Sequence, residues 1–167
     1  MSLRMSKGGF ALTELIIVIL VMFTLLAIVS LDFNAWQKKY GIQAQVQEMA
    51  TELNDLRIAA MQKKKGHSVE LKPTSYTFRI YSSESDFSSG AGTVVMTKRA
   101  KYRVTNLAGA DIDTFVMIDE RGYVSGIAAP SLAVGLDTTV EASPNCLVMS
   151  VSRVNVGRLN GGTCEFR

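Results

Sequence analysis

An unbroken apolar run dominates the N-terminal part of the chain. From Phe10 to Leu31, 18 of 22 residues are apolar, and neither Pro nor Gly interrupts them. As an α-helix this run would be roughly 33 Å long, about the hydrocarbon thickness of a bilayer. We therefore expect residues 10–31 to form a transmembrane helix segment. A secretory signal peptide is the alternative, but no small-x-small cleavage site follows the run at a suitable distance.

The helical pattern continues beyond this run as an amphipathic segment over residues 32–65. Apolar residues recur there at steps of four and three positions, which is the spacing of one helix face. They are Ile42, Val46, Met49, Leu53, Leu56 and Ala60. The opposite, polar face carries Gln43, Gln45, Gln47, Glu48, Asn54 and Asp55. Since no Pro occurs before residue 73, we expect one long helix from Phe10 to Lys65.

Three lysines at 63–65 precede Gly66 and predict the end of this helix. Cations suit the negative end of the helix dipole, and Gly66 would be the left-handed C′ residue. A basic cluster could instead bind phosphate, but three lysines that end an amphipathic helix need no other cause.

After Gly66 the pattern changes to alternation of apolar and polar residues, which is typical of β-strands. We expect strands at residues 69–71, 76–81, 93–96, 102–105, 115–119, 123–124, 147–156 and 158–159. Residues 82–92 predict a loop, residues 130–137 an irregular segment, and Glu120-Arg121-Gly122 a hairpin turn. Residues 66–167 are thus expected to form a globular antiparallel β domain. The predicted fold class is α+β, with the long N-terminal helix packed on an antiparallel sheet.

Charge and composition exclude several classes of protein. The net charge is +3, but Arg4 and Lys7 precede the apolar run, and the rest of the chain has 16 basic against 15 acidic residues. A strongly basic nucleic-acid-binding protein is therefore not expected. The positive-inside rule places Arg4 and Lys7 in the cytoplasm and the C-terminal body on the other side of the membrane. With one histidine and no GxSxG motif, we expect no catalytic residues, no metal and no cofactor.

Glu14 is the only charged residue between Phe10 and Leu31. A carboxylate in or near a membrane is costly unless it is paired, so Glu14 is a functional candidate, with snorkelling to the interface as the alternative. Its context is Lys7-Gly8-Gly9-Phe10-Ala11-Leu12-Thr13-Glu14. This segment resembles the N-terminal signature of the type IV pilins and type II secretion pseudopilins: a short basic leader that ends in Gly, then Phe at the first mature position and Glu at the fifth.

The resemblance implies a processing and assembly pathway. Residues 1–9 would be a prepilin leader, a prepilin peptidase would cleave between Gly9 and Phe10, and the new amine of Phe10 would be methylated. Glu14 would act in assembly, where the N-terminal helix packs against other pilins or minor pilins with the help of an inner-membrane assembly platform. Before assembly the chain would be a single-pass protein of the bacterial inner membrane, in contact with lipid, with its C-terminal domain in the periplasm.

The body resembles the GspH/FimT/FimU-like minor pilins. The similar segments are Leu53–Ala60 running into the lysines, residues 115–122 and residues 150–158. The expected function is therefore that of a minor pilin, assembled into a type IV pilus or priming it. The alternatives are a type II secretion pseudopilin and a DNA-binding minor pilin in DNA uptake.

Two cysteines, Cys146 and Cys164, lie near the C-terminus. In a body outside the cytoplasm, two cysteines are most simply one disulfide, with two buried free thiols as the alternative. A late disulfide also resembles the pattern of minor pilins more than that of the secretion pseudopilins.

Four basic residues make DNA a second interpretation. Arg99, Lys101 and Arg103 would share one face of the strand predicted there. Some FimT-like pilins bind DNA through Gly-Arg-x-Arg near the C-terminus, and the run Gly157-Arg158-Leu159-Asn160 is similar but has Asn in place of the second Arg. A solvated basic face is the favoured interpretation, and DNA is not the favoured partner.

Overall fold

The computed structural model describes residues 11–125 and 130–166, apart from the side chains of residues 28–32 and of Ser125. Its helices are α1 (Leu12–Lys63) and α2 (Glu84–Ser89). The strands are β1 (His67–Lys72), β2 (Ser75–Ile80), β3 (Thr93–Arg99), β4 (Val104–Asn106), β5 (Thr114–Ile118), β6 (Val124–Ser125), β7 (Ser131–Val134), β8 (Cys146–Met149), β9 (Val154–Asn160) and β10 (Thr163–Glu165). The chain divides into two compact units, Met1–Gln37 and Lys38–Arg167.

The first unit contains the beginning of α1. Its first turn is closed by the backbone N–H of Glu14, which donates to the carbonyl of Ala11 at 2.9 Å. Every described side chain of residues 11–27 is exposed, although most are apolar. Among the residues that the structure describes, no helix combines the length and the hydropathy of a membrane span. The transmembrane segment at 10–31 stays a prediction.

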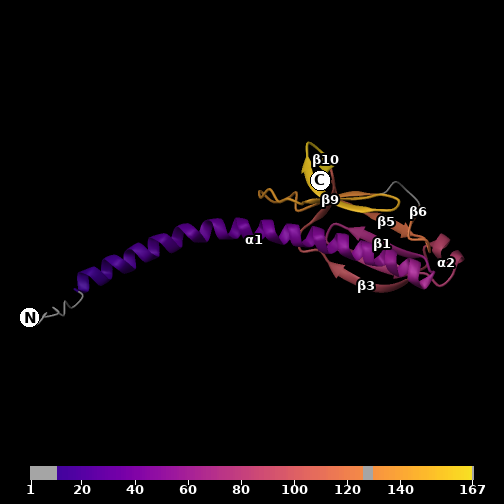
Figure 1. Ribbon diagram of the computed structural model, residues 1–167, viewed down its shortest axis with the longest axis horizontal. Coiled ribbons are helices and arrows are strands. Elements are labelled where there is room, and N and C mark those ends of the chain that lie inside the picture. Colours follow the sequence, from indigo (N-terminus) through magenta and orange to yellow (C-terminus); the bar gives the residue numbers. More distant parts are fainter. Residues whose placement is uncertain (1–10, 126–129, 167) are drawn as a thin grey trace, which may run out of the picture. The chain divides into compact units, whose positions relative to one another are not determined.

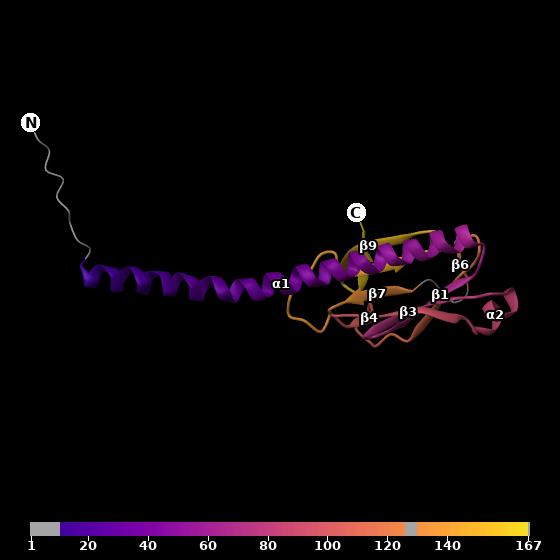
Figure 2. The same cartoon turned by 90° about the horizontal axis from the view of Figure 1, so that it is seen from below.

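The second unit holds two five-stranded antiparallel sheets. One has the strand order β3-β2-β1-β5-β6 and the other β10-β9-β8-β7-β4. The remainder of α1 packs on these sheets (Figures 1 and 2), so the fold is α+β with an N-terminal helix on antiparallel sheets, as predicted.

The core of this unit confirms the apolar stripe of the helix. Ile42, Val46, Met49 and Leu53 are buried against side chains of both sheets, whereas Leu56 is half-buried at the margin. Their partners in the sheets include Val69, Leu71, Tyr76, Phe78, Val104, Val116, Leu132, Val134, Leu147 and Met149. Burying each large apolar side chain stabilises the fold by roughly 1.5–3 kcal/mol, so this single cluster binds helix and sheets into one body.

The helix ends within the predicted lysine cluster, but the left-handed residue that ends it is not the predicted one. Lys64, not Gly66, has the left-handed conformation, with a φ of 51°. The N–H of Lys65 donates to the carbonyl of Ala60 at 3.3 Å, which completes a Schellman-type end. Gly66 serves a different purpose, because a Cβ there would lie 2.4 Å from the ring of Phe87.

Two further predictions about local structure are wrong. Within the expected loop at 82–92, α2 forms because the Ser83 hydroxyl accepts from the N–H of Asp86 and Gly90 ends the helix at a φ of 73°. Within the expected irregular segment at 130–137, β7 is a central strand. Leu132, Ala133 and Val134 are all buried, so this short strand has no polar alternation by which to recognise it.

The later hairpins agree with the sequence in part. The turn at Glu120-Arg121-Gly122 is confirmed: Gly122 has a φ of 79°, and its N–H donates to the carbonyl of Asp119 at 2.9 Å. The strand predicted at 147–156 is two strands, because the N–H of Ser150 donates to the carbonyl of Arg153 and turns the chain between β8 and β9.

Candidate functional site

The residues predicted for processing and assembly lie at the start of the chain. Gly9 and Phe10 fall outside the described residues. Glu14 lies in the first turn of α1 and is exposed. A carboxylate at this position is stabilised by the positive end of the helix dipole. It is therefore placed where it both supports the helix end and stays accessible to a cationic partner.

Behind Glu14, α1 presents apolar side chains on all sides. Leu12, Phe23 and Leu26 are each at least two-thirds exposed. A shallow groove of about 430 Å³ runs along one helix face between Ile16, Ile19, Leu20, Phe23, Thr24 and Ala27. Exposed apolar surface of this extent is characteristic of segments that are covered by a partner or by lipid.

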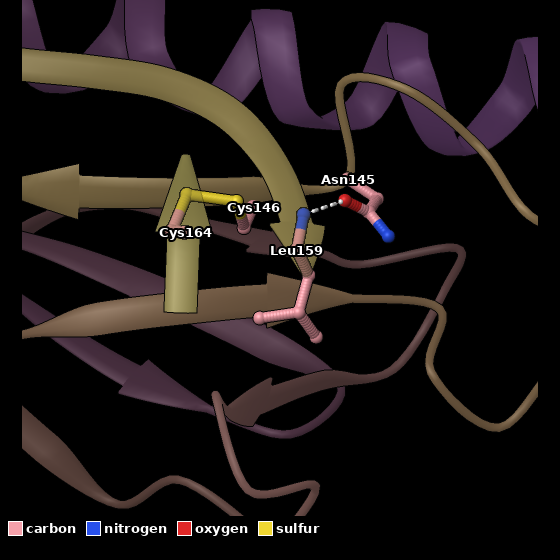
Figure 3. Close-up of a disulfide and its surroundings, with 4 residues drawn as sticks. All are labelled: Asn145, Cys146, Leu159 and Cys164. Atoms are coloured by element: carbon pink, nitrogen blue, oxygen red, sulfur yellow. Dashed lines mark hydrogen bonds between the residues drawn. A yellow bond between two sulfur atoms is a disulfide. The ribbon is translucent and has the colours of Figure 1, made fainter. Parts of the chain in front are cut away.

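The two cysteines form a disulfide, as predicted. Cys146 on β8 and Cys164 on β10 have Cα atoms 5.9 Å apart, and both are buried (Figure 3). The described residues contain no free cysteine. Asn145, next to Cys146, accepts a hydrogen bond through its side-chain oxygen from the N–H of Leu159 at 2.7 Å, as Figure 3 shows. The bond and this contact together fix the last two strands to β8.

Gly157 explains how the disulfide can pass between strands that are not neighbours. β9 lies between β8 and β10, and Gly157 is the β9 residue paired with Cys146. A Cβ at Gly157 would lie 2.3 Å from the carbonyl oxygen of Glu165 and 3.1 Å from Sγ of Cys164. Only a glycine leaves room for β10 and the disulfide at this point.

The structure does not place the predicted basic residues on one strand. β3 ends at Arg99, and Lys101 and Arg103 lie in the segment before β4. The ammonium group of Lys101 lies 5.5 Å from the centre of the Tyr102 ring. The prediction that these cations share one strand face is therefore wrong, because β3 ends at Arg99, four residues before Arg103.

Two of the candidate arginines are also paired with carboxylates. Arg103 makes a bidentate contact with Asp111 at 2.5–2.8 Å, which raises the pKa of the guanidinium further above its ordinary value. Arg158 contacts Glu141 at 3.1 Å. Among the described residues, neither Arg99 nor Lys101 has an ion pair with a carboxylate, so these two cations of the set keep their charges least compensated.

A neighbouring cation is used to hold the helix to the sheet. Lys98 on β3 pairs with Glu48 and with the mostly buried Glu52, both on α1, and the two carboxylates raise the pKa of the Lys98 ammonium group. Burial and then the Glu52 carboxylate raise the pKa of Tyr76 beside them. The charge of Lys98, just before Arg99, therefore has a structural role.

An exposed edge on β3 was not predicted from the amino-acid pattern. This strand ends its sheet, and Val94, Val95 and Met96 are exposed on it. Beside it, an apolar groove of about 360 Å³ lies between β3 and α1, lined in part by Leu56 and Phe78. Three consecutive apolar residues without a polar alternation were the only signal that could have indicated this surface.

The chain has one histidine, and it lies at the start of β1. His67 is buried, and its Nδ1 donates to the carbonyl of Lys65 at 2.9 Å, while burial lowers its pKa. Within the described ranges, no group of three His, Cys, Asp or Glu side chains could hold a metal ion. The features suited to a function are thus the Glu14 end of an apolar helix and a disulfide-bonded body. No family model, curated protein or solved structure matches this chain.

Proposed function

We propose that the chain is a minor pilin, made as a precursor in the bacterial inner membrane and assembled through its N-terminal helix into a type IV pilus. The observation that carries the proposal is the Gly9-Phe10 junction with Glu14 at the fifth position of the mature chain, followed by a helical segment, residues 11–27, whose apolar side chains are exposed on all sides. In this proposal residues 10–31 are the membrane half of a pilin-like helix. Neighbouring subunits replace the lipid around it during assembly.

The body supports this proposal in two ways. It is a separate compact unit in which a helix packs on antiparallel sheets, and it ends in a disulfide. The late disulfide favours a pilus subunit over a type II secretion pseudopilin, given the resemblance to minor pilins. Deleting the gene separates the two functions, because loss of pili with normal secretion supports the first and the reverse result supports the second.

Glu14 would compensate the charge that processing creates. Removal of residues 1–9 leaves an amine on Phe10, four residues before the Glu14 carboxylate. In a filament this cation must lie among the apolar helices of neighbouring subunits, and burying it without a counter-ion is costly. No other acid occurs on the segment from 10 to 31, so Glu14 is the residue that can offset the cost.

Two measurements in the native host test the proposal. Mass spectrometry of the membrane protein should find an N-terminus at Phe10 with one additional methyl group. Glu14→Ala should leave insertion and cleavage intact, since it makes the segment more apolar and does not alter the Gly9 junction. The variant should be missing from sheared filaments, with Glu84→Ala, an exposed acid of the body, as the matched control.

The outcomes are decisive in either direction. A chain that still begins at Met1 in a host with a prepilin peptidase would refute the pilin proposal. Equal recovery of wild-type and Glu14→Ala protein in filaments would refute the role of Glu14 in assembly but not the pilin proposal.

DNA uptake remains a second candidate because Arg99 and Lys101 are exposed on the body. We expect weak DNA binding at physiological salt, since Arg103 and Arg158 are already paired with carboxylates. Tight binding that falls with salt and is lost in Arg99→Ala/Lys101→Ala would make the chain a DNA-binding minor pilin instead.

A further inference from the structure

Two aromatic side chains lie on one face of α1 shortly after the apolar run. Phe33 and Trp36 are separated by three positions, and their rings are stacked with centroids 6.0 Å apart and planes inclined by 30°. Their exposed fractions are 55% and 56%. The described polar residues Asn34 and Gln37 lie beside them in the sequence, so the apolar character of the helix ends here.

The position of this pair along the helix matches the thickness of a membrane. Leu12 and Phe33 are 21 residues apart, which corresponds to roughly 32 Å of helix, against about 30 Å for the hydrocarbon core of a bilayer. Trp36 then lies about 4.5 Å further along the axis. If the helix enters the hydrocarbon near Leu12, these rings reach the opposite boundary between acyl chains and headgroups.

The chemistry of the pair suits that boundary better than either adjoining phase. An indole ring has a large apolar surface and one N–H donor, and tryptophan is enriched at headgroup level because both can be satisfied there. Phe33 extends the apolar part of the surface toward the acyl chains. In water the two rings would leave an aromatic surface exposed, and deeper in the hydrocarbon the polar edge of the indole would leave the hydrated headgroup layer.

We propose, on the basis of the membrane stage of the proposed function, that Phe33 and Trp36 form an interfacial anchor that binds the phospholipid headgroup boundary on the periplasmic side. The anchor fixes the depth of the helix before assembly. The partner is the lipid surface itself.

Trp36 is the only tryptophan of the chain, so its fluorescence reports on this site alone. The full chain is reconstituted into phosphatidylcholine vesicles whose lipids carry bromine either next to the headgroup or deep in the acyl chains. We expect the emission of Trp36 to be shifted to shorter wavelength than in urea. It should be quenched more strongly by the shallow bromines than by the deep ones.

Two matched variants calibrate the depth. Trp36→Phe/Phe23→Trp moves the reporter to Phe23, midway between Leu12 and Phe33, where deep bromines should quench more strongly. Trp36→Phe/Tyr123→Trp moves it to an exposed position of the body, where neither lipid should quench.

Each pattern of quenching has one meaning. Shallow quenching of Trp36 with deep quenching at position 23 supports the anchor. Deep quenching at position 23 without shallow quenching of Trp36 overturns the anchor and leaves the membrane stage intact. Absence of quenching at both positions overturns the anchor together with the membrane stage of the proposed function.

Discussion

Reduction of the Cys146–Cys164 disulfide should destabilise the body by about 3 kcal/mol. The two cysteines are separated by 18 positions, and closing a loop of that size removes roughly 10–11 cal/mol/K of entropy from the unfolded chain. Both side chains are buried, so the bond also holds β10 over Gly157 in the folded state. The perturbation acts on the last two strands and leaves the helix–sheet core in place.

The effect is measured by urea or thermal unfolding of the oxidised and reduced protein. Unfolding the 130 residues of Lys38–Arg167 corresponds to an entropy of about 270 cal/mol/K, so 3 kcal/mol would lower the melting temperature by about 11 °C. Because the bond is buried, the protein is reduced while unfolded and then refolded under reducing conditions. A thiol assay should find two reactive groups after this treatment and none before it.

The control is the Cys146→Ser/Cys164→Ser variant, whose unfolding should not respond to reductant. Since the chain has only these two cysteines, any response of the wild type comes from this bond. Equal unfolding midpoints for the fully reduced and the oxidised wild type would refute the reasoning. Such a result would mean that the disulfide does not lower the entropy of the unfolded chain enough to stabilise the fold.

Other contacts of the body have separate tests. Gly157→Ala should lower the free energy of unfolding by roughly 1–3 kcal/mol, because the added Cβ would meet the backbone of β10 at 2.3 Å; an unchanged urea midpoint would contradict this packing. Burial lowers the pKa of His67, the only histidine, below 6.5, so the free energy of unfolding should decrease as the pH falls from 6.5 toward the folded-state pKa. His67→Gln should abolish that slope, and its persistence would assign the slope to other groups. Lys98→Met should cost about 1–3 kcal/mol by leaving Glu52 without its cation, whereas Arg158→Met, which breaks an exposed pair, should cost less than about 1 kcal/mol; equal costs would contradict this difference.

The elements with strong periodicity could be predicted from the sequence. The helix predicted over 10–65 is described as Leu12–Lys63, and its apolar stripe is the one that is buried. The turn at Gly122 could also be predicted, because it depends on neighbouring residues. The pairing of the cysteines could be predicted because the chain has only two of them. The helix and the turn are encoded by residues close together in the sequence, and with two cysteines only one disulfide is possible within the chain.

Features that depend on tertiary contacts could not be predicted in this way. Gln45 was expected on the solvent face of the helix but is buried, and its amide bonds to both the carbonyl and the N–H of Tyr102. The ion pairs that Lys98 makes with Glu48 and Glu52 of α1 were not predicted. Gly157 carries no local signal either, since its need for a missing side chain arises only from β10. For Gln45 and Lys98 the partner lies far away in the sequence, and for Gly157 it lies on the adjacent strand β10.

The two parts of the chain differ in where their apolar surface is used. In the body, apolar side chains of α1 such as Val46 and Leu53 are buried against the sheets, and their burial stabilises the fold of a single chain. In residues 11–27 the described apolar side chains remain exposed, so their burial energy is not used in folding that chain. In the proposed pathway this energy would stabilise contacts first with lipid and then with neighbouring helices. Apolar contacts between helices are not directional, so they do not fix the axial position of one helix against its neighbour. A charge such as that of Glu14 can distinguish one axial position from the next. In the proposed assembly pathway, this division would let the body fold and form its disulfide before the helix exchanges lipid for protein.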